Sequence, residues 1–128
     1  MKFLVMIYPD PDLLAAMPEG EFKSTMRQCL EHADELRREG RLLDAQMLQP
    51  TNTAKSLRTK NGTVTVVDGP FAETKEVLGG FNVIEAPNID EAVEIARAFP
   101  WTDIGCVEVR PILEVDDMRE RVGAPRSA

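Results

Sequence analysis

A turn is predicted within the stretch Asp68-Gly69-Pro70-Phe71-Ala72-Glu73-Thr74-Lys75-Glu76-Val77-Leu78-Gly79-Gly80. Asp68 can accept hydrogen bonds from the backbone N–H groups that follow it, Gly69 permits backbone angles closed to other residues, and Pro70 cannot extend a strand ladder. Phe71 offers one large apolar side chain to anchor the loop, and the glycine pair at its end releases the chain into the next apolar run. We therefore expect a loop of fixed shape between two strands.

A strand, a helix and a second strand are predicted near the start of the chain. Residues 2–8 form a continuous apolar run that indicates a central strand covered on both faces, and the two prolines at positions 9 and 11 predict a loop after it. Apolar residues recur at three- and four-residue steps over residues 21–39, which predicts an amphipathic helix capped by Gly40. The run 42–48 is predicted to be the next strand.

The second half of the chain repeats this order after a hairpin. Residues 55–60 and 63–67 flank Asn61-Gly62, a pair suited to a two-residue type I′ turn. The run 81–86 predicts a strand, and Asn88 with Glu91 resembles a capping box that starts a second helix. Its expected buried positions are Ile89, Ala92, Val93, Ala96 and Phe99, and Pro100 should end it. Residues 106–112 predict the last strand, and the polar residues from Asp116 onward are expected to fray.

Without the hairpin, the order is strand-helix-strand followed by strand-helix-strand. Two such units predict an α+β fold of the ferredoxin-like, split βαβ kind, with an antiparallel sheet and both helices on one face. The other face is left bare, although the first strand is apolar on both sides. A second copy of the chain is the simplest cover, so we expect a homodimer.

The motif that runs from Asp68 to Gly80 also resembles the signature of the DGPF subgroup of YCII-related proteins. The resemblance extends over residues 1–113 by the order of elements, and it leaves residues 114–128 as a polar tail. It implies a ferredoxin-like dimeric α/β barrel with an inserted β-hairpin. It implies little about function, because this family is largely uncharacterised.

Composition narrows the kinds of function. The chain has 128 residues, a net charge of −7 and a pI near 4.7, which fit one domain and disfavour direct binding to nucleic acid. Its first apolar run is too short to span a membrane, so we expect a cytoplasmic protein with no membrane contact. Two separated cysteines and one histidine predict neither a disulfide framework nor a metal site. Nucleotide-binding and hydrolase motifs are missing from the sequence, and we expect no cofactor.

The last strand separates the two faces of the sheet. Val107 and Val109 should face the helices, while Cys106, Glu108 and Arg110 should face the other way. Glu108 and Arg110 would then line a cleft between two sheets of a dimer. There they would either pair and fix the register of the dimer or meet a polar ligand; the sequence leaves both open.

The signature loop, residues 68–80, likewise has either a ligand-binding or a structural role. Its polar groups could stand at the mouth of the cleft, or Asp68 could cap the turn and Phe71 anchor it while the charged residues form a solvated rim. Candidate acid–base groups are Glu108, Arg110, Asp68 and Tyr8. The full predicted ligand-binding set is Tyr8, Asp68, Phe71, Glu73, Lys75, Glu108 and Arg110.

His32 lies at the margin of the predicted first helix, and we interpret it as a surface or margin histidine. Other YCII-related proteins are thought to use a histidine on this helix with an aspartate just before the proline that ends the second helix. The matching positions here are Cys29 and Phe99, so the resemblance does not supply that pair. Cys29 should face the core, where a nucleophilic role is disfavoured.

Two functions of different classes follow. The first is a homodimeric small-molecule-binding domain, with a possible acid–base site between the sheets. The second is a non-catalytic regulatory module, because relatives of this subgroup often resemble companions of extracytoplasmic-function sigma factors. Here the acidic surface would meet a basic sigma-factor partner.

Overall fold

The computed structural model describes residues 1–72 and 74–126 and contains both strands and helices. Four strands form an antiparallel sheet in the order β2-β5-β1-β6, and β3 and β4 pair as a separate hairpin. This is the ferredoxin-like α+β fold with an inserted hairpin, as the order of elements predicted. The elements are β1 (Lys2–Pro9), α1 (Pro11–Ala16), α2 (Glu19–Arg38), β2 (Leu42–Met47), η1 (Thr51–Thr53), β3 (Lys55–Lys60), β4 (Thr63–Asp68), β5 (Gly80–Glu85), α3 (Ile89–Arg97), η2 (Pro100–Asp103), β6 (Gly105–Pro111) and α4 (Val115–Val122).

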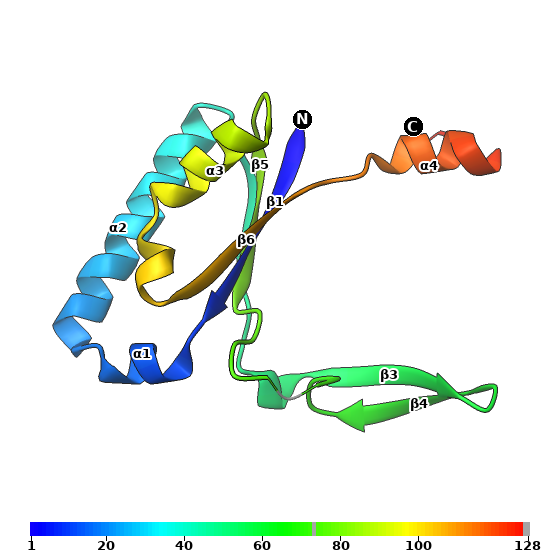
Figure 1. Cartoon of the computed structure of the whole chain (residues 1–128), viewed down its shortest axis with the longest axis horizontal. Coiled ribbons are helices and arrows are strands. Elements are labelled where there is room, and N and C mark those ends of the chain that lie inside the picture. Colours follow the sequence, from blue (N-terminus) through cyan, green and yellow to red (C-terminus); the bar gives the residue numbers. More distant parts are fainter. Residues whose placement is uncertain (73, 127–128) are drawn as a thin grey trace.

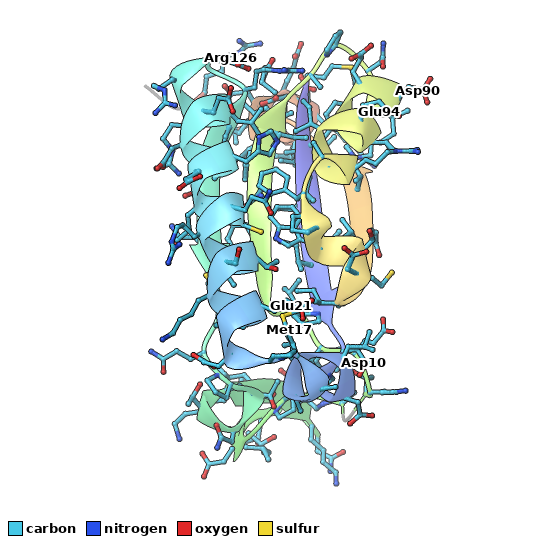
Figure 2. The ribbon with its side chains drawn as sticks, turned by 90° about the vertical axis from the view of Figure 1, so that its left-hand side faces the viewer. Asp10, Met17, Glu21, Asp90, Glu94 and Arg126 are labelled. Atoms are coloured by element: carbon cyan, nitrogen blue, oxygen red, sulfur yellow. The ribbon has the colours of Figure 1, made fainter. Side chains whose placement is uncertain are left out.

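The core lies between the sheet and the two longer helices. Figures 1 and 2 show α2 and α3 side by side on one face of the sheet. Side chains alternate along β1, so Phe3 and Val5 point to the helices, where they are almost fully buried with Ile84 of β5. The helices contribute Cys29, Leu36, Ala92, Ile95 and Ala96 to the same core.

Several local expectations differ from the structure. A short helix, α1, follows β1 where a loop was predicted, because the Asp10 carboxylate accepts a hydrogen bond from the Asp12 N–H (2.9 Å) and caps it. The terminal segment forms α4 rather than fraying. Of the positions predicted to be buried, Ala92, Ala96 and Phe99 are buried, whereas Ile89 is 40% exposed and Ile95, which was not predicted, is buried.

The predicted hairpin turn is confirmed. Asn61 and Gly62 have φ angles of 52° and 78°, the positive values that a type I′ turn requires. In Figure 1 the hairpin extends away from the four-stranded sheet.

The second face of the sheet is apolar at its centre. Leu4 and Met6 of β1 stand opposite Val83 and Phe81 of β5, and all four point away from the helices; Met6 is 8% exposed and the other three are half-buried. In the described part of the chain no helix lies over them, and the hairpin and α4 extend beyond the sheet on this side (Figure 1). We call this surface the open face.

Gly105, at the start of β6, sets how closely β6 approaches β1. A Cβ atom added there would overlap the carbonyl oxygen of Tyr8 and lie 2.8 Å from Cα of Pro9. Both are backbone atoms of β1, which cannot rotate away as a flexible side chain can. Only glycine fits at this position without moving a strand.

We therefore expect Gly105→Ala to lower the free energy of unfolding by about 1–3 kcal/mol or more, because the added methyl group overpacks two backbones. Chemical denaturation monitored by circular dichroism would measure it. Gly20→Ala is the matched control: no atom lies within 4 Å of its added Cβ, and alanine favours the helix. Equal effects of the two substitutions would contradict the close approach at Gly105.

Candidate functional site

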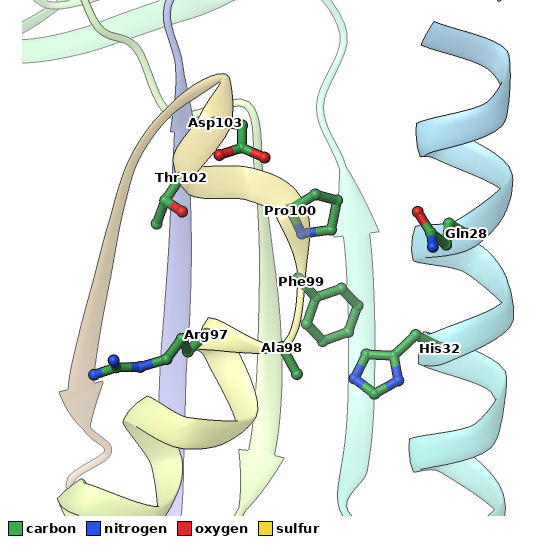
Figure 3. Close-up of a pocket in the computed structure, with 8 residues that line it drawn as sticks. All are labelled: Gln28, His32, Arg97, Ala98, Phe99, Pro100, Thr102 and Asp103. Atoms are coloured by element: carbon green, nitrogen blue, oxygen red, sulfur yellow. The ribbon is translucent and has the colours of Figure 1, made fainter. Parts of the chain in front are cut away.

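A hollow on the helical side of the protein lies between α2 and the segment that joins α3 to η2. Its volume is about 450 Å³. Figure 3 shows Gln28 and His32 projecting from α2 toward Phe99 and Pro100 across the gap. The complete lining is Gln28, His32, Arg97, Ala98, Phe99, Pro100, Thr102 and Asp103. We call it the His32 pocket.

An aromatic stack forms one wall of the His32 pocket. The His32 ring meets Phe99 edge-on, with ring centroids 4.6 Å apart. Phe99 in turn stacks on Trp101 at 4.0 Å, almost parallel. Pro100 stands between the two aromatic residues and begins η2, so the chain turns back and lays Trp101 against Phe99. The Phe99–Trp101 stack that backs this wall is therefore formed by a local turn.

One ring nitrogen of His32, Nε2, has no hydrogen-bond partner among the described residues. This atom is buried, although the side chain as a whole is 31% exposed. Its Nδ1 atom lies 3.8 Å from a carboxylate oxygen of Glu35. In a neutral imidazole one nitrogen donates a hydrogen bond and the other accepts one, so Nε2 can pair with either kind of group. A buried polar atom without a partner costs about 1–3 kcal/mol, so a hydrogen-bonding group that reached Nε2 would be favoured.

Cys29 lies beneath the same wall. It is buried, as predicted, and its burial raises the pKa of the thiol, while a hydrogen bond from the Trp101 side chain lowers it in part. The net upward shift holds the sulfur in its protonated form, which is a poor nucleophile. Cys29 therefore packs the floor of the stack rather than performing chemistry.

The predicted residues of β6 lie on the predicted faces. Val107 and Val109 pack against the core, while Glu108 and Arg110 are exposed on the open face, with Arg110 Nη1 3.6 Å from Glu108 Oε2. Tyr8 lies on the same face, and its hydroxyl donates to the Met6 sulfur at 3.6 Å. None of Tyr8, Glu108 and Arg110 lines the His32 pocket. A cleft around them requires a second chain and stays a prediction.

The signature loop is held by the base of the hairpin. Asp68 pairs with Lys55 across the two strands at 2.5 Å, so its carboxylate serves the hairpin rather than the turn. Lys75 Nζ lies 3.7 Å from a carboxylate oxygen of Asp10 at the start of α1. Phe71, expected to anchor the loop, is instead 77% exposed in the chain. Glu73 lies outside the described residues.

A second hollow, of about 550 Å³, lies beside this loop. It brings Asp68 together with η1 and with the turn that follows β4. Its lining is Thr51, Asn52, Asp68, Gly69, Pro70, Ala72, Thr74 and Val77. Among the predicted site residues that the structure describes, only Asp68 belongs to it, and its carboxylate is already paired with Lys55.

Sequence reasoning placed His32 at the helix margin correctly but missed its surroundings. The ring gains its environment from Phe99 and from the turn at Pro100, which are remote along the chain. One signal was present: Phe99-Pro100-Trp101 places two aromatic residues around a helix stop. The pattern indicates an aromatic cluster, but it does not say which face of α2 would meet it.

Within residues 1–72 and 74–126, no group of three or more histidine, cysteine, aspartate or glutamate side chains converges as metal ligands would. No helix in that part of the chain is long and apolar enough to cross a membrane.

Comparison with known sequences places the chain in a family. The profile of the YCII-related domain matches residues 1–116. An uncharacterised protein of Rhizobium meliloti (strain 1021) is 38% identical over 116 residues, which cover 88% of this chain and 92% of that protein.

A solved structure shares the fold. It is 5-chloro-2-hydroxyhydroquinone dehydrochlorinase (TftG) from Burkholderia phenoliruptrix AC1100, in complex with 2,5-dihydroxybenzoquinone. The match has a TM-score of 0.51 and 17% identity, and covers 89% of this chain and 95% of that one. At this identity the likeness supports the ferredoxin-like fold.

The raised pKa of Cys29 predicts a pH dependence of stability. A thiol of this kind contributes stability that is complete below the pKa of the unfolded chain, near 9, and is lost as the pH rises through the higher folded value. Under reducing conditions, the free energy of unfolding should fall more steeply above about pH 9 for the wild type than for Cys29→Ala.

Cys106→Ala is the control for this comparison, because it removes the exposed cysteine. Its stability should follow the wild-type curve with pH. Parallel curves for the wild type and Cys29→Ala would contradict the assignment.

Proposed function

The chain belongs to the YCII-related family, and from that premise we propose that it is a homodimeric small-molecule-binding domain whose ligand enters the His32 pocket. The open face joins the two copies. Tyr8, Glu108 and Arg110 line the seam between the sheets, where they set the register of the dimer or meet a ligand from the opposite side.

The observation that carries the ligand site is the buried Nε2 atom of His32. His32 lines a hollow whose other polar groups are a glutamine amide, the Arg97 guanidinium, a threonine hydroxyl and an aspartate carboxylate. Pockets that combine an apolar wall with a few convergent polar groups are the usual form of small-molecule sites. The volume of about 450 Å³ suits a single ring with small substituents.

The chemistry of the lining indicates the class of ligand. The Asp103 carboxylate accepts hydrogen bonds, the Arg97 guanidinium donates them, and a neutral imidazole does one at each nitrogen, so the ligand should carry hydroxyl groups, which both donate and accept. The edge and face of Phe99 favour a planar ring beside them. A small hydroxylated aromatic or quinonoid compound meets both conditions. TftG, which shares the fold, is described with 2,5-dihydroxybenzoquinone, a compound of this class.

The open face carries the proposal of a dimer. Leu4, Met6, Phe81 and Val83 form an apolar centre on a face that no described helix covers, and charged groups of β6 stand at its edge. An apolar centre with a polar rim is the usual composition of an interface between subunits. Packing two such faces together would bury both centres at once.

The single histidine makes the pocket directly observable. We expect the imidazole carbon-bound proton signals of His32 to shift in NMR spectra on titration with 2,5-dihydroxybenzoquinone or a hydroxybenzoate. Thr102→Val should weaken the binding by roughly tenfold if the hydroxyl contributes one hydrogen bond. Thr65→Val, remote from the pocket on β4, is the control. Unmoved His32 signals at millimolar concentrations of both compounds would overturn the ligand site.

For the dimer, we expect Val83→Asp to shift the protein toward monomers in sedimentation equilibrium, since a carboxylate would be buried without a partner at the centre of the interface. Lys23→Asp, on the exposed side of α2, should leave the mass unchanged. A wild type that sediments as a monomer at micromolar concentration would refute the dimer. It would leave the His32 pocket untouched, because the pocket lies on the opposite side of the sheet.

A further inference from the structure

Two projecting elements of this chain have uncovered apolar faces. The hairpin, residues 55–68, carries Leu57, Val64 and Val66 on one face, because Leu57 stands opposite Val66 and Thr59 opposite Val64. These three side chains are 66%, 60% and 60% exposed. Their face is a small apolar ribbon with nothing described over it.

The C-terminal helix α4 has a matching stripe. Val115, Met118 and Val122 recur at three- and four-residue steps and therefore share one side of the helix. They are 60%, 38% and 67% exposed. Acidic residues begin the helix and Gly123, in the left-handed conformation, ends it. The helix is well formed but has no hydrophobic partner within the described chain.

Neither element is long enough to be stable by itself. An isolated two-stranded hairpin and a helix of eight residues are both marginal in water. Here β3 and β4 pack mainly on each other, and α4 makes at most marginal contact with other described elements. Both need a cover to hold the positions in which they stand.

One chain cannot supply that cover, but two can. Figure 1 shows the hairpin and α4 at opposite ends of the sheet, both extending on the side of the open face. If two open faces pack about a two-fold axis perpendicular to the strands, the hairpin end of each sheet lies against the α4 end of the other. The hairpin of each copy then lies beside α4 of the other. A two-fold axis parallel to the strands would instead pair hairpin with hairpin and helix with helix.

Charge distinguishes the two arrangements. The hairpin is a basic element in an acidic protein, with Lys55, Arg58 and Lys60 against one carboxylate, Asp68. Residues 114–122 are acidic, with four carboxylates against Arg119 and Arg121. With the axis perpendicular to the strands, the basic hairpin of one copy lies beside the acidic helix of the other, and opposite net charges surround the two apolar stripes. With the axis parallel to the strands, elements of like charge would meet.

We infer that two copies of this chain exchange these elements, with α4 of each copy packed on the Leu57–Val64–Val66 face of the other's hairpin. This inference rests on the proposed homodimer and adds its geometry. The sheets form the centre of the interface, and the two helix–hairpin contacts close its ends. Each contact is made twice by symmetry.

Hydrogen exchange tests the contact. Met118→Glu would place a charge in the apolar stripe of α4, and we expect exchange of the hairpin amides to accelerate by roughly tenfold or more, since burial of a methionine is worth at least that factor. Asp117→Glu keeps the charge on the opposite side of the helix and should leave exchange unchanged. If Met118→Glu leaves the exchange rates of the hairpin amides unchanged while the protein is still a dimer, the inference is overturned.

Cross-linking tests which copy supplies the helix. In a Cys29→Ala, Cys106→Ser background, chains with Leu57→Cys and chains with Met118→Cys would be refolded together and treated with a short bismaleimide. We expect linked pairs only between the two kinds of chain. Links within either kind alone would indicate the parallel axis, and a stable dimer with no links would also reject the exchange. Native mass spectra separate these results from failure of the dimer itself, in which no dimer mass is seen before cross-linking.

Discussion

β1 carries apolar side chains on both of its faces, and the arrangement of every other layer depends on that constraint. Phe3 and Val5 are almost fully buried beneath the helices, while Leu4 and Met6 point to the open face. β1 pairs with β5 on one side and with β6 on the other, so the side chains of these two strands also alternate between the helical core and the open face. The result is one core that the chain closes by itself and one apolar face that a single copy leaves open.

The signature loop holds the hairpin at the edge of this sheet. The Gly79 N–H donates to the Ile7 carbonyl, and the Leu48 N–H donates to the Gly79 carbonyl, both at 2.8 Å. These bonds tie β1, β2 and the start of β5 together at one end. The other end of the loop is bound to the hairpin, through the Ser56 hydroxyl on the Gly69 carbonyl and the Arg58 guanidinium on the Phe71 carbonyl. The motif therefore connects the hairpin to the sheet by hydrogen bonds at both of its ends, and the hairpin extends beyond the sheet on the side of the open face.

The His32 pocket depends on a different local event, the end of α3. Pro100 begins a short turn that lays Trp101 on Phe99, and the Trp101 side chain reaches the buried Cys29 of α2. This stack links the two helices and leaves His32 at its edge. The two positions that other YCII-related proteins are thought to use for a histidine–aspartate pair carry Cys29 and Phe99 here, and both now belong to the apolar wall. The polar groups of the pocket come from neighbouring positions instead.

The sequence by itself determined the order of the strands and of the two longer helices, the hairpin turn and the faces of β6, although it did not reveal α1 or α4. Those features follow from periods of 2 and 3.6 residues and from turn chemistry, which act over a few neighbouring positions. It also indicated that one face of the sheet needs a cover. Only the tertiary structure decided that His32 meets Phe99, that Asp68 pairs with Lys55 rather than capping its turn, and that Phe71 stands exposed. These contacts depend on the angle and depth at which distant elements pack. The pattern of a single helix or strand specifies which face is apolar, but not which residue of another element will lie against it.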